Sequence, residues 1–114
     1  MTERMTHKEY VAMQRRRVAE LARQILDGEI DVLDGSNEIA SLRSEVEVED
    51  SDQDFMAFGI VSSETDHLPI GREALNWSNE ALVRKEPELK SSREWAIEIV
   101  RAECASLVVR FADA

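Results

Sequence analysis

Residues 87–112, PELKSSREWAIEIVRAECASLVVRFA, carry the most regular apolar pattern in the chain. Apolar side chains recur every three or four residues along one line, at Ala96, Val100, Cys104, Leu107 and Phe111. This spacing predicts an amphipathic helix. Further apolar residues widen the stripe, namely Trp95, Ile97, Ile99 and Val108. We therefore expect a central helix that its neighbours contact from several sides.

The segment before this helix contains two signals for a helix start. Ser78 is a good N-cap and predicts a short helix through Lys85. Pro87 suits the first position of a helix, because the backbone N–H that proline lacks has no partner there. The sequence therefore predicts two successive helices that are separated just before Pro87.

Two further helices are expected in the first half of the chain. One covers residues 6–27, because Thr6-His7-Lys8-Glu9 is a capping box and Gly28 can end a helix in a left-handed conformation. The other covers residues 30–44. Gly35 weakens it by about 1 kcal/mol relative to Ala, and two shorter pieces that restart at Ser36 are the alternative. The short link between the two helices favours an antiparallel pair.

An uninterrupted apolar run, FMAFGIV, begins at Phe55 and fits either a buried strand or a helix. Ser51 or Asp52 can serve as an N-cap, and acids occupy the first turn. Phe55 and Phe58 share a face at helical spacing. These features favour a helix over residues 52–65.

The acidic stretch at residues 45–54 begins with the alternation Glu45-Val46-Glu47-Val48-Glu49, which has the period of a strand. One short strand has no partner here, and Asp and Glu disfavour strands. We therefore expect a loop. Together these elements predict an all-α fold over residues 1–114, a compact single-domain bundle of about four helices with an acidic loop after the second.

Charge is concentrated in the middle third of the chain. The 114 residues include 24 acidic and 14 basic side chains, for a net charge of −10. Residues 27–66 hold thirteen acids and one base, Arg43. This excess argues against nucleic acid or an anionic membrane as the main partner, because phosphate groups would repel it. The basic run Arg15-Arg16-Arg17 is expected to pair with this acidic third inside the molecule.

Several other classes of protein are disfavoured. The single cysteine, Cys104, excludes an internal disulfide and a zinc site built from cysteines. We expect it to be a small core residue, and we expect no cofactor. No apolar run approaches the roughly 20 residues that span a bilayer, and residues 1–7 lack the apolar stretch of a secretory signal. The sequence therefore predicts a cytoplasmic protein.

One motif offers metal or acid–base chemistry. Glu64-Thr65-Asp66-His67 has the Glu-x-x-His spacing that places two ligands on one helical face. The Asp66 carboxylate could instead orient the His67 ring. A metal-binding bundle or a metal-dependent hydrolase that uses Glu64, Asp66, His67 and nearby acids is therefore the alternative function. A capping role at a helix end is favoured over it, because di-iron bundles need a second such motif and further inward glutamates.

Three stretches carry a resemblance to known sequences: DGEID at residues 27–31, ASLR at residues 40–43 and ETDHLPIG at residues 64–71. At these points the chain resembles a family of short, acidic, uncharacterised bacterial proteins, over much of residues 20–112. The resemblance implies a bacterial source and a compact, mostly helical fold. It brings no established activity, although some proteins of similar size and charge act as immunity proteins.

The acidic middle third is the strongest functional signal. Its densest part has six acids within ten residues: Glu45, Glu47, Glu49, Asp50, Asp52 and Asp54. Phe55, Phe58 and Trp77 are candidate anchors, since aromatic residues dominate interface hot spots. Dense carboxylates attract a basic partner and speed its encounter. We therefore expect a non-enzymatic interaction protein, in particular an immunity-type inhibitor of a cationic toxin. Self-association remains open.

Overall fold

Helices account for the chain's secondary structure over residues 5–114, the part that a computed structural model describes. Four are α-helices: α1 (His7–Leu26), α2 (Val32–Leu42), α3 (Gln53–Glu64) and α4 (Asn79–Arg110). Two are 3₁₀ segments, η1 (Arg43–Glu45) and η2 (Gly71–Asn76). Residues 5–114 contain no strand. The predicted all-α bundle of about four helices, with an acidic loop after the second, is therefore confirmed.

The structure bears on the predicted absence of a membrane span, and it covers only part of the stretch examined for a secretory signal. Residues 1–4, at the start of the stretch examined for a secretory signal, lie outside the described residues. Over residues 5–114, every helix is too short or too polar to cross a bilayer.

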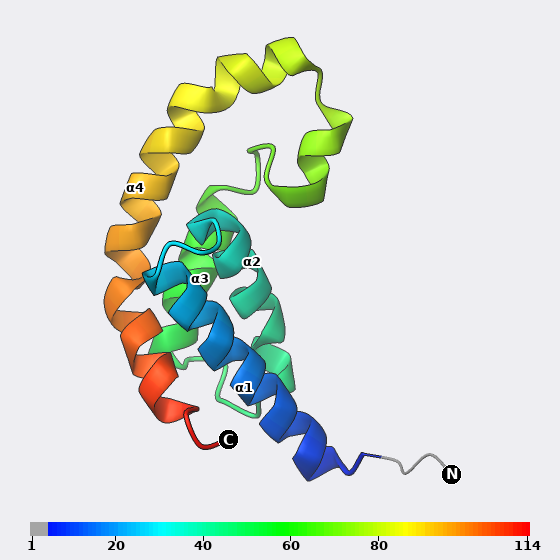
Figure 1. Cartoon of the computed structure of the whole chain (residues 1–114), viewed down its shortest axis with the longest axis vertical. Helices are drawn as coiled ribbons and strands as arrows, with labels where there is room; N and C mark the ends of the chain where they lie inside the picture. The colour runs from blue at the N-terminus through cyan, green and yellow to red at the C-terminus, as the bar shows by residue number, and fades with distance from the viewer. Residues whose placement is uncertain (1–4) are drawn as a thin grey trace.

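The N-cap and the glycine end of α1 form as predicted, whereas the return bond of the capping box, from the Thr6 N–H to the Glu9 carboxylate, is absent in the described residues. The Thr6 hydroxyl accepts a hydrogen bond from the Glu9 N–H at 3.1 Å and caps the first turn. Gly28 has a φ of +72°, which non-glycine residues rarely adopt. The Glu29 N–H then returns to the Gln24 carbonyl at 2.9 Å. The chain turns back at this point, and α2 runs antiparallel to α1 (Figure 1).

Gly35 lies inside α2, which is continuous from Val32 to Leu42 with Asp31 as its N-cap. The alternative of two pieces is therefore wrong. A Cβ atom at Gly35 would lie 2.7 Å from Cδ1 of Ile25 and 2.9 Å from Cδ1 of Ile30. The glycine is needed because these side chains approach the α2 backbone closely, and it does not mark a break.

The acidic stretch and the apolar run after it also form as predicted. Turns, with no strand, connect η1 to α3. Asp52 caps α3, and its Oδ1 accepts from the N–H groups of Asp54 and Phe55 at 3.1 and 3.4 Å. The strand alternative for the run that begins at Phe55 is therefore wrong.

Pro87 does not separate two helices, contrary to the prediction. Ser78 is the N-cap, accepting from the Ala81 N–H at 3.1 Å, but α4 then continues through Pro87. A proline inside a helix removes one hydrogen bond, here to the Val83 carbonyl, and costs about 3 kcal/mol. Both residues are exposed, so water can bind the freed carbonyl. The lost hydrogen bond therefore leaves no buried unsatisfied group, and the helix continues through Pro87.

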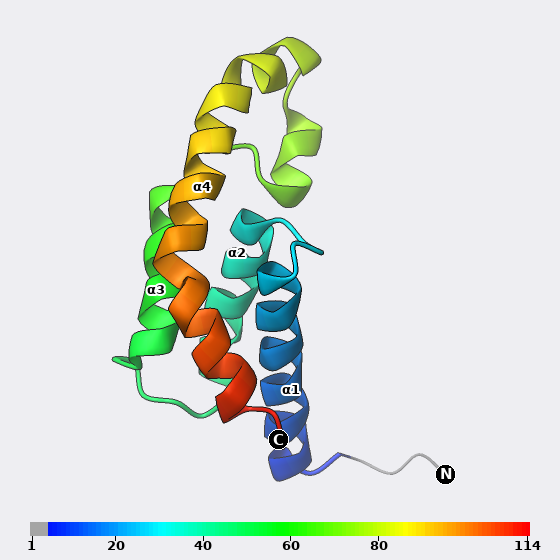
Figure 2. The same cartoon turned by 60° about the vertical axis from the view of Figure 1, so that its left-hand side comes forward.

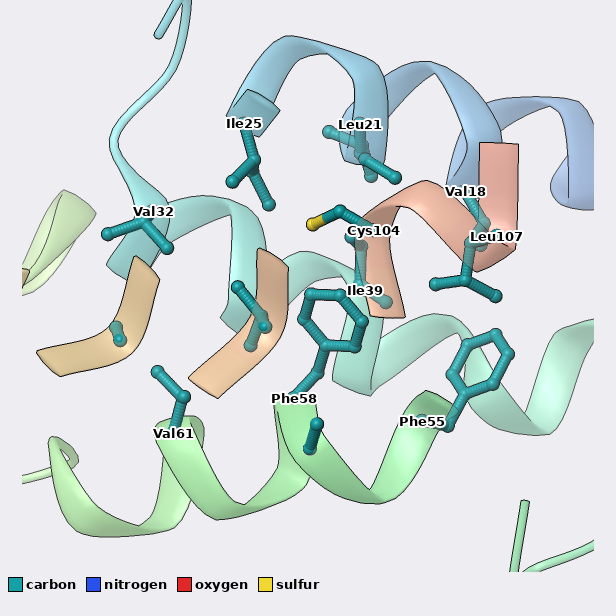
Figure 3. Close-up of a cluster of buried hydrophobic side chains, with 14 of the residues drawn as sticks. Val18, Leu21, Ile25, Val32, Ile39, Phe55, Phe58, Val61, Cys104 and Leu107 are labelled. Carbon is teal, nitrogen blue, oxygen red and sulfur yellow. The ribbon is translucent and has the colours of Figure 1, made fainter. Parts of the chain in front are cut away.

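The core lies where the four α-helices meet, with α4 running beside both α1 and α3 (Figures 1 and 2). Phe58 points from α3 toward Ile39 of α2 and Cys104 of α4 (Figure 3). The predicted stripe of α4 is buried at Ala96, Val100, Cys104, Leu107 and Phe111. Burial raises the pKa of the Cys104 thiol to about 12, so this side chain stays protonated. Cys104 is the core residue that its place on the stripe predicted.

Residues 71–88, which we call the arm, project beyond the bundle (Figure 1). The arm comprises η2, a short connection and the first turns of α4. Within these eighteen residues, all of which the structure describes, none is buried. Leu75 is 85% exposed and Val83 is 73% exposed. Residues 79–88 of α4 therefore continue a packed helix into solvent.

Candidate partner-binding site

The acidic segment, residues 45–54, serves the fold at its C-terminal end. Arg110 binds Asp52 at 2.9 Å and Asp54 at 2.8 Å, and the two carboxylates are only 14% and 18% exposed. The Ser106 hydroxyl also donates to Asp54 at 2.6 Å. Hydrogen bonds from Arg110 hold the pKa of Asp52 below its usual range. These contacts tie the start of α3 to the end of α4, so two of the six predicted contact acids act inside the molecule.

The rest of this segment is partly neutralised. Glu47 lies 3.1 Å from Nε2 of His7, and Asp50 lies 2.5 Å from Arg43. Nε of Arg15 donates to the carbonyl of the buried Val46 at 2.9 Å. Among the ion pairs of the described residues, none involves the remaining two acids, Glu45 and Glu49.

The three aromatic residues predicted as anchors do not lie with these acids on one surface, and Phe58 is fully buried. Phe55 is 2% exposed and points into the core toward Leu107 (Figure 3), so it is not accessible to a partner. It occupies the buried face of α3, where helical spacing also places Phe58. Trp77 is half-buried and lies in the arm, after η2. The expected patch of acids with aromatic anchors is therefore not assembled.

The motif Glu64-x-x-His67 does not assemble a metal site. α3 ends at Glu64, so Asp66 and His67 lie beyond the helix and lose the helical register that would align them. His67 instead binds Glu88 of the arm at 2.6 Å, at an exposed position. Glu64, His67 and Glu88 do line a hollow of about 270 Å³. In the described part of the chain, no three His, Cys, Asp or Glu residues are grouped closely enough to hold a metal ion.

The basic run on α1 pairs with the acidic third less than expected. Arg17 binds Glu38 of α2 at 3.0 Å, which is an ion pair of the predicted kind. Arg16 donates to the backbone carbonyl of Ala114 at 2.9 Å. Arg15 also donates to a carbonyl rather than to a carboxylate. One of the three arginines therefore neutralises an acid.

A groove that sequence reasoning did not single out lies at the other end of α2. It has a volume of about 840 Å³ between α1, α2 and residues 70–72. Its apolar lining includes Leu21, Ile30, Gly35 and Ile70. Three carboxylates of α2 also line it, Asp31, Asp34 and Glu38. Their i, i+3, i+7 spacing, which places them on one helical face, was readable in the sequence.

These three carboxylates differ in how they are balanced. Asp31 binds Arg93 at 2.5 Å, and Glu38 binds Arg17. Asp34 takes part in no ion pair among the described residues. Its desolvation and the charges of Asp31 and Glu38 raise its pKa, and the nearby charge of Arg93 offsets part of this rise. Asp34 is therefore a half-buried carboxylate in a groove, and no cation of residues 5–114 forms an ion pair with it.

The wall opposite Asp34 is a tightly placed glycine. Gly71 has a φ of +60°, and a Cβ at this position would lie 3.1 Å from Oδ1 of Asp34. Both the backbone conformation and this close approach favour glycine. The segment that begins the arm therefore also completes the groove.

Comparisons with known proteins add no further guide to function. The chain matches no model of a protein family, and no curated protein or solved structure is significantly similar to it.

Proposed function

We propose that this protein is a non-enzymatic interaction module that binds a basic protein through its acidic middle third, in the manner of an immunity-type inhibitor. One observation carries the proposal: the negative excess of this third survives folding. Residues 27–66 hold thirteen acids and one base. Arginines from outside that pair with them are Arg17, Arg23, Arg93 and Arg110. Four positive charges do not balance an excess of twelve.

The acids of this third that form no ion pair within residues 5–114 are accessible from outside. Glu49, Glu64 and Asp66 are exposed, while Glu45 and Asp34 are half-buried. Carboxylates in such positions raise the rate of encounter with a cationic surface and oppose association with an anionic one. On a cationic enzyme that acts on phosphate-containing substrates, they would occupy the places meant for phosphate groups.

The proposal is tested by charge reversal at unpaired acids. The test variant combines Glu45→Lys, Glu49→Lys and Glu64→Lys. The control variant combines Glu80→Lys, Glu94→Lys and Glu98→Lys, which makes the same change of charge at exposed α4 positions that form no ion pair in the described residues. The wild-type chain, immobilised, is used to capture proteins from the extract of its native cell, and each captured protein is then purified and titrated against all three chains.

The expected result is a basic protein whose affinity falls at least tenfold with the test variant and less than threefold with the control. Its affinity for the wild-type chain should also fall as salt rises, because the contact is electrostatic. Equal losses with the two triple variants would show that net charge alone matters, and they would overturn the proposal. Direct binding of an acidic protein that both variants leave unchanged would overturn it as well.

A further inference from the structure

We propose that the groove between α1, α2 and residues 70–72 receives an arginine side chain of the basic partner, with the guanidinium group against Asp34. This inference rests on the proposed function and adds the chemical group that the partner presents. It also places the contact on α2, away from residues 45–54, which follow the opposite end of that helix.

The shape of the groove fits a side chain that is apolar along its stem and charged at its tip. Leu21, Ile30 and Ile70 line it and offer contacts to methylene groups. The carboxylates of α2 lie along the same groove. Long basic side chains lie in this way, with the stem on an apolar surface and the head at a polar site.

Charge within the groove favours a cation at one position. Arg93 and Arg17 satisfy Asp31 and Glu38, which leaves Asp34 as the carboxylate without a partner among the described residues. The groove's own rim arginine, Arg72, is exposed and forms no ion pair with it in residues 5–114. Arg93 acts on Asp34 from its place on Asp31, so a cation from outside would gain the direct ion pair that Asp34 does not form within residues 5–114.

The arrangement of the carboxylates favours arginine over lysine. Asp34 and Glu38 are one helical turn apart on the same face of α2. Arg17 binds Oε2 of Glu38, so Oε1 can be reached together with the oxygens of Asp34. A guanidinium has five N–H donors in a planar fork and can bind one carboxylate through two bonds while it contacts a second. The ammonium of lysine is a compact, strongly hydrated charge with no such fork.

The experiment is an NMR titration of the ¹⁵N-labelled full chain with three blocked tripeptides. They are acetyl-Ala-Arg-Ala-amide, its lysine counterpart and its citrulline counterpart, which keeps the shape of arginine without the charge. Shifts are followed at the amides of residues 33–38 and 70–72. Asp34→Asn removes the charge at nearly constant size, and because Asp34 forms no ion pair in the described residues, we expect this variant to fold. Glu80→Gln, in the arm, is the matched control.

The arginine peptide should shift these amides with saturation, at least threefold more tightly than the lysine peptide. Asp34→Asn should weaken it at least fivefold, and Glu80→Gln should leave it unchanged. If the citrulline peptide caused shifts equal to those of the arginine peptide, the groove would bind an uncharged peptide segment equally well. Shifts that depend on protein concentration alone would assign it to a second copy. Either result, or equal binding by Asp34→Asn, overturns the inference.

The two proposals fail separately. The capture experiment reverses charges at Glu45, Glu49 and Glu64, none of which lines this groove. Loss of arginine binding with an intact capture result would overturn the groove assignment alone. If the capture result contradicted the proposed function, the peptide titration would still show independently whether the groove binds arginine.

Discussion

The two parts of α4, residues 79–88 and residues 89–110, have the same secondary structure and opposite surroundings. From Leu89 onward, the helix places a buried residue on the core at nearly every turn. Before it, within residues 79–88, none is buried. The first part therefore persists because it extends a helix that is already formed, since adding a residue to a helix is much easier than starting one. The local stability of each part of α4 therefore depends on packing against the core, and helix formation alone does not determine it.

The bundle and the arm therefore contribute differently to the stability of the protein. Buried apolar groups and the Arg110 ion pairs hold the bundle together. The arm exposes large apolar side chains, and its link to the loop after α3 is the exposed pair of His67 and Glu88. We therefore expect substitutions in the bundle to change global stability, and substitutions in the arm to change local behaviour.

The largest effect is expected for Phe58→Ala. Phe58 is fully buried at the centre of the core, so truncation should lower the free energy of unfolding by about 3–5 kcal/mol. Val83→Ala, in the arm, should change it by less than about 0.5 kcal/mol. Urea denaturation followed by circular dichroism measures both. Similar losses for the two variants would show that the arm belongs to the same cooperative unit as the core.

The second effect concerns Gly35→Ala. Alanine is the better helix former by about 1 kcal/mol, but its Cβ would lie 2.7 Å from the side chain of Ile25. Overpacking of this kind costs about 1–3 kcal/mol, so we expect a net loss of stability in urea denaturation. In an Ile25→Ala background, where only the 2.9 Å approach of Ile30 remains, the same substitution should cost clearly less. A stabilising Gly35→Ala in the wild-type background would show that α1 and α2 adjust freely at this contact.

The sequence predicted those parts of the fold that depend on neighbours along the chain. The N-caps at Thr6, Asp52 and Ser78 act within three residues, and all three form. The structural roles of Gly35 and Pro87 were predicted wrongly, because they depend on which other parts of the folded chain contact these residues. Gly35 faces Ile25 of another helix, whereas Pro87 is exposed, so water can bind the carbonyl that it leaves free.

The candidate site was harder to predict for the same reason. The density of acids at residues 45–54 is visible in the sequence, but Asp52 and Asp54 bind Arg110, more than fifty residues away. The groove at Asp34 needs residues 70–72 as its wall, and only the folded chain brings them there. Spacing on α2 could have identified the carboxylates, while no local pattern could show which one lacks a partner.

The third effect is the pH dependence of Asp52→Asn. Asparagine keeps the oxygen that caps α3 but removes the charge that binds Arg110, so we expect a loss of about 1 kcal/mol at pH 7. Arg110 holds the pKa of Asp52 below its usual range. The stabilisation is therefore present above about pH 4 and is lost as pH falls through the lowered pKa. Urea denaturation of both chains at pH 7, 5 and 3 should show the difference shrinking in acid.

Glu88→Gln is the matched substitution in the arm. His67 and Lys85 lower the pKa of Glu88 as well. These ion pairs are exposed, and Glu88 lies before the packed part of α4, which begins at Leu89. Global stability should therefore respond weakly at every pH. If Asp52→Asn kept its full effect at pH 3, packing or capping would explain the loss in place of charge.

The smallest global effect is expected for Pro87→Ala, although proline is the residue least suited to a helix interior. Alanine restores the N–H that can bond to the Val83 carbonyl and removes the ring that crowds it. Because residues 79–88 are not packed, this gain should appear as slower amide exchange there, by several-fold, and not in the unfolding midpoint. Hydrogen exchange by NMR and urea denaturation of the same samples separate the two. A rise of about 3 kcal/mol in global stability would mean that the arm unfolds together with the bundle. Residues 79–88 and residues 89–110 of α4 would then differ only in exposure, because both would belong to one cooperative unit.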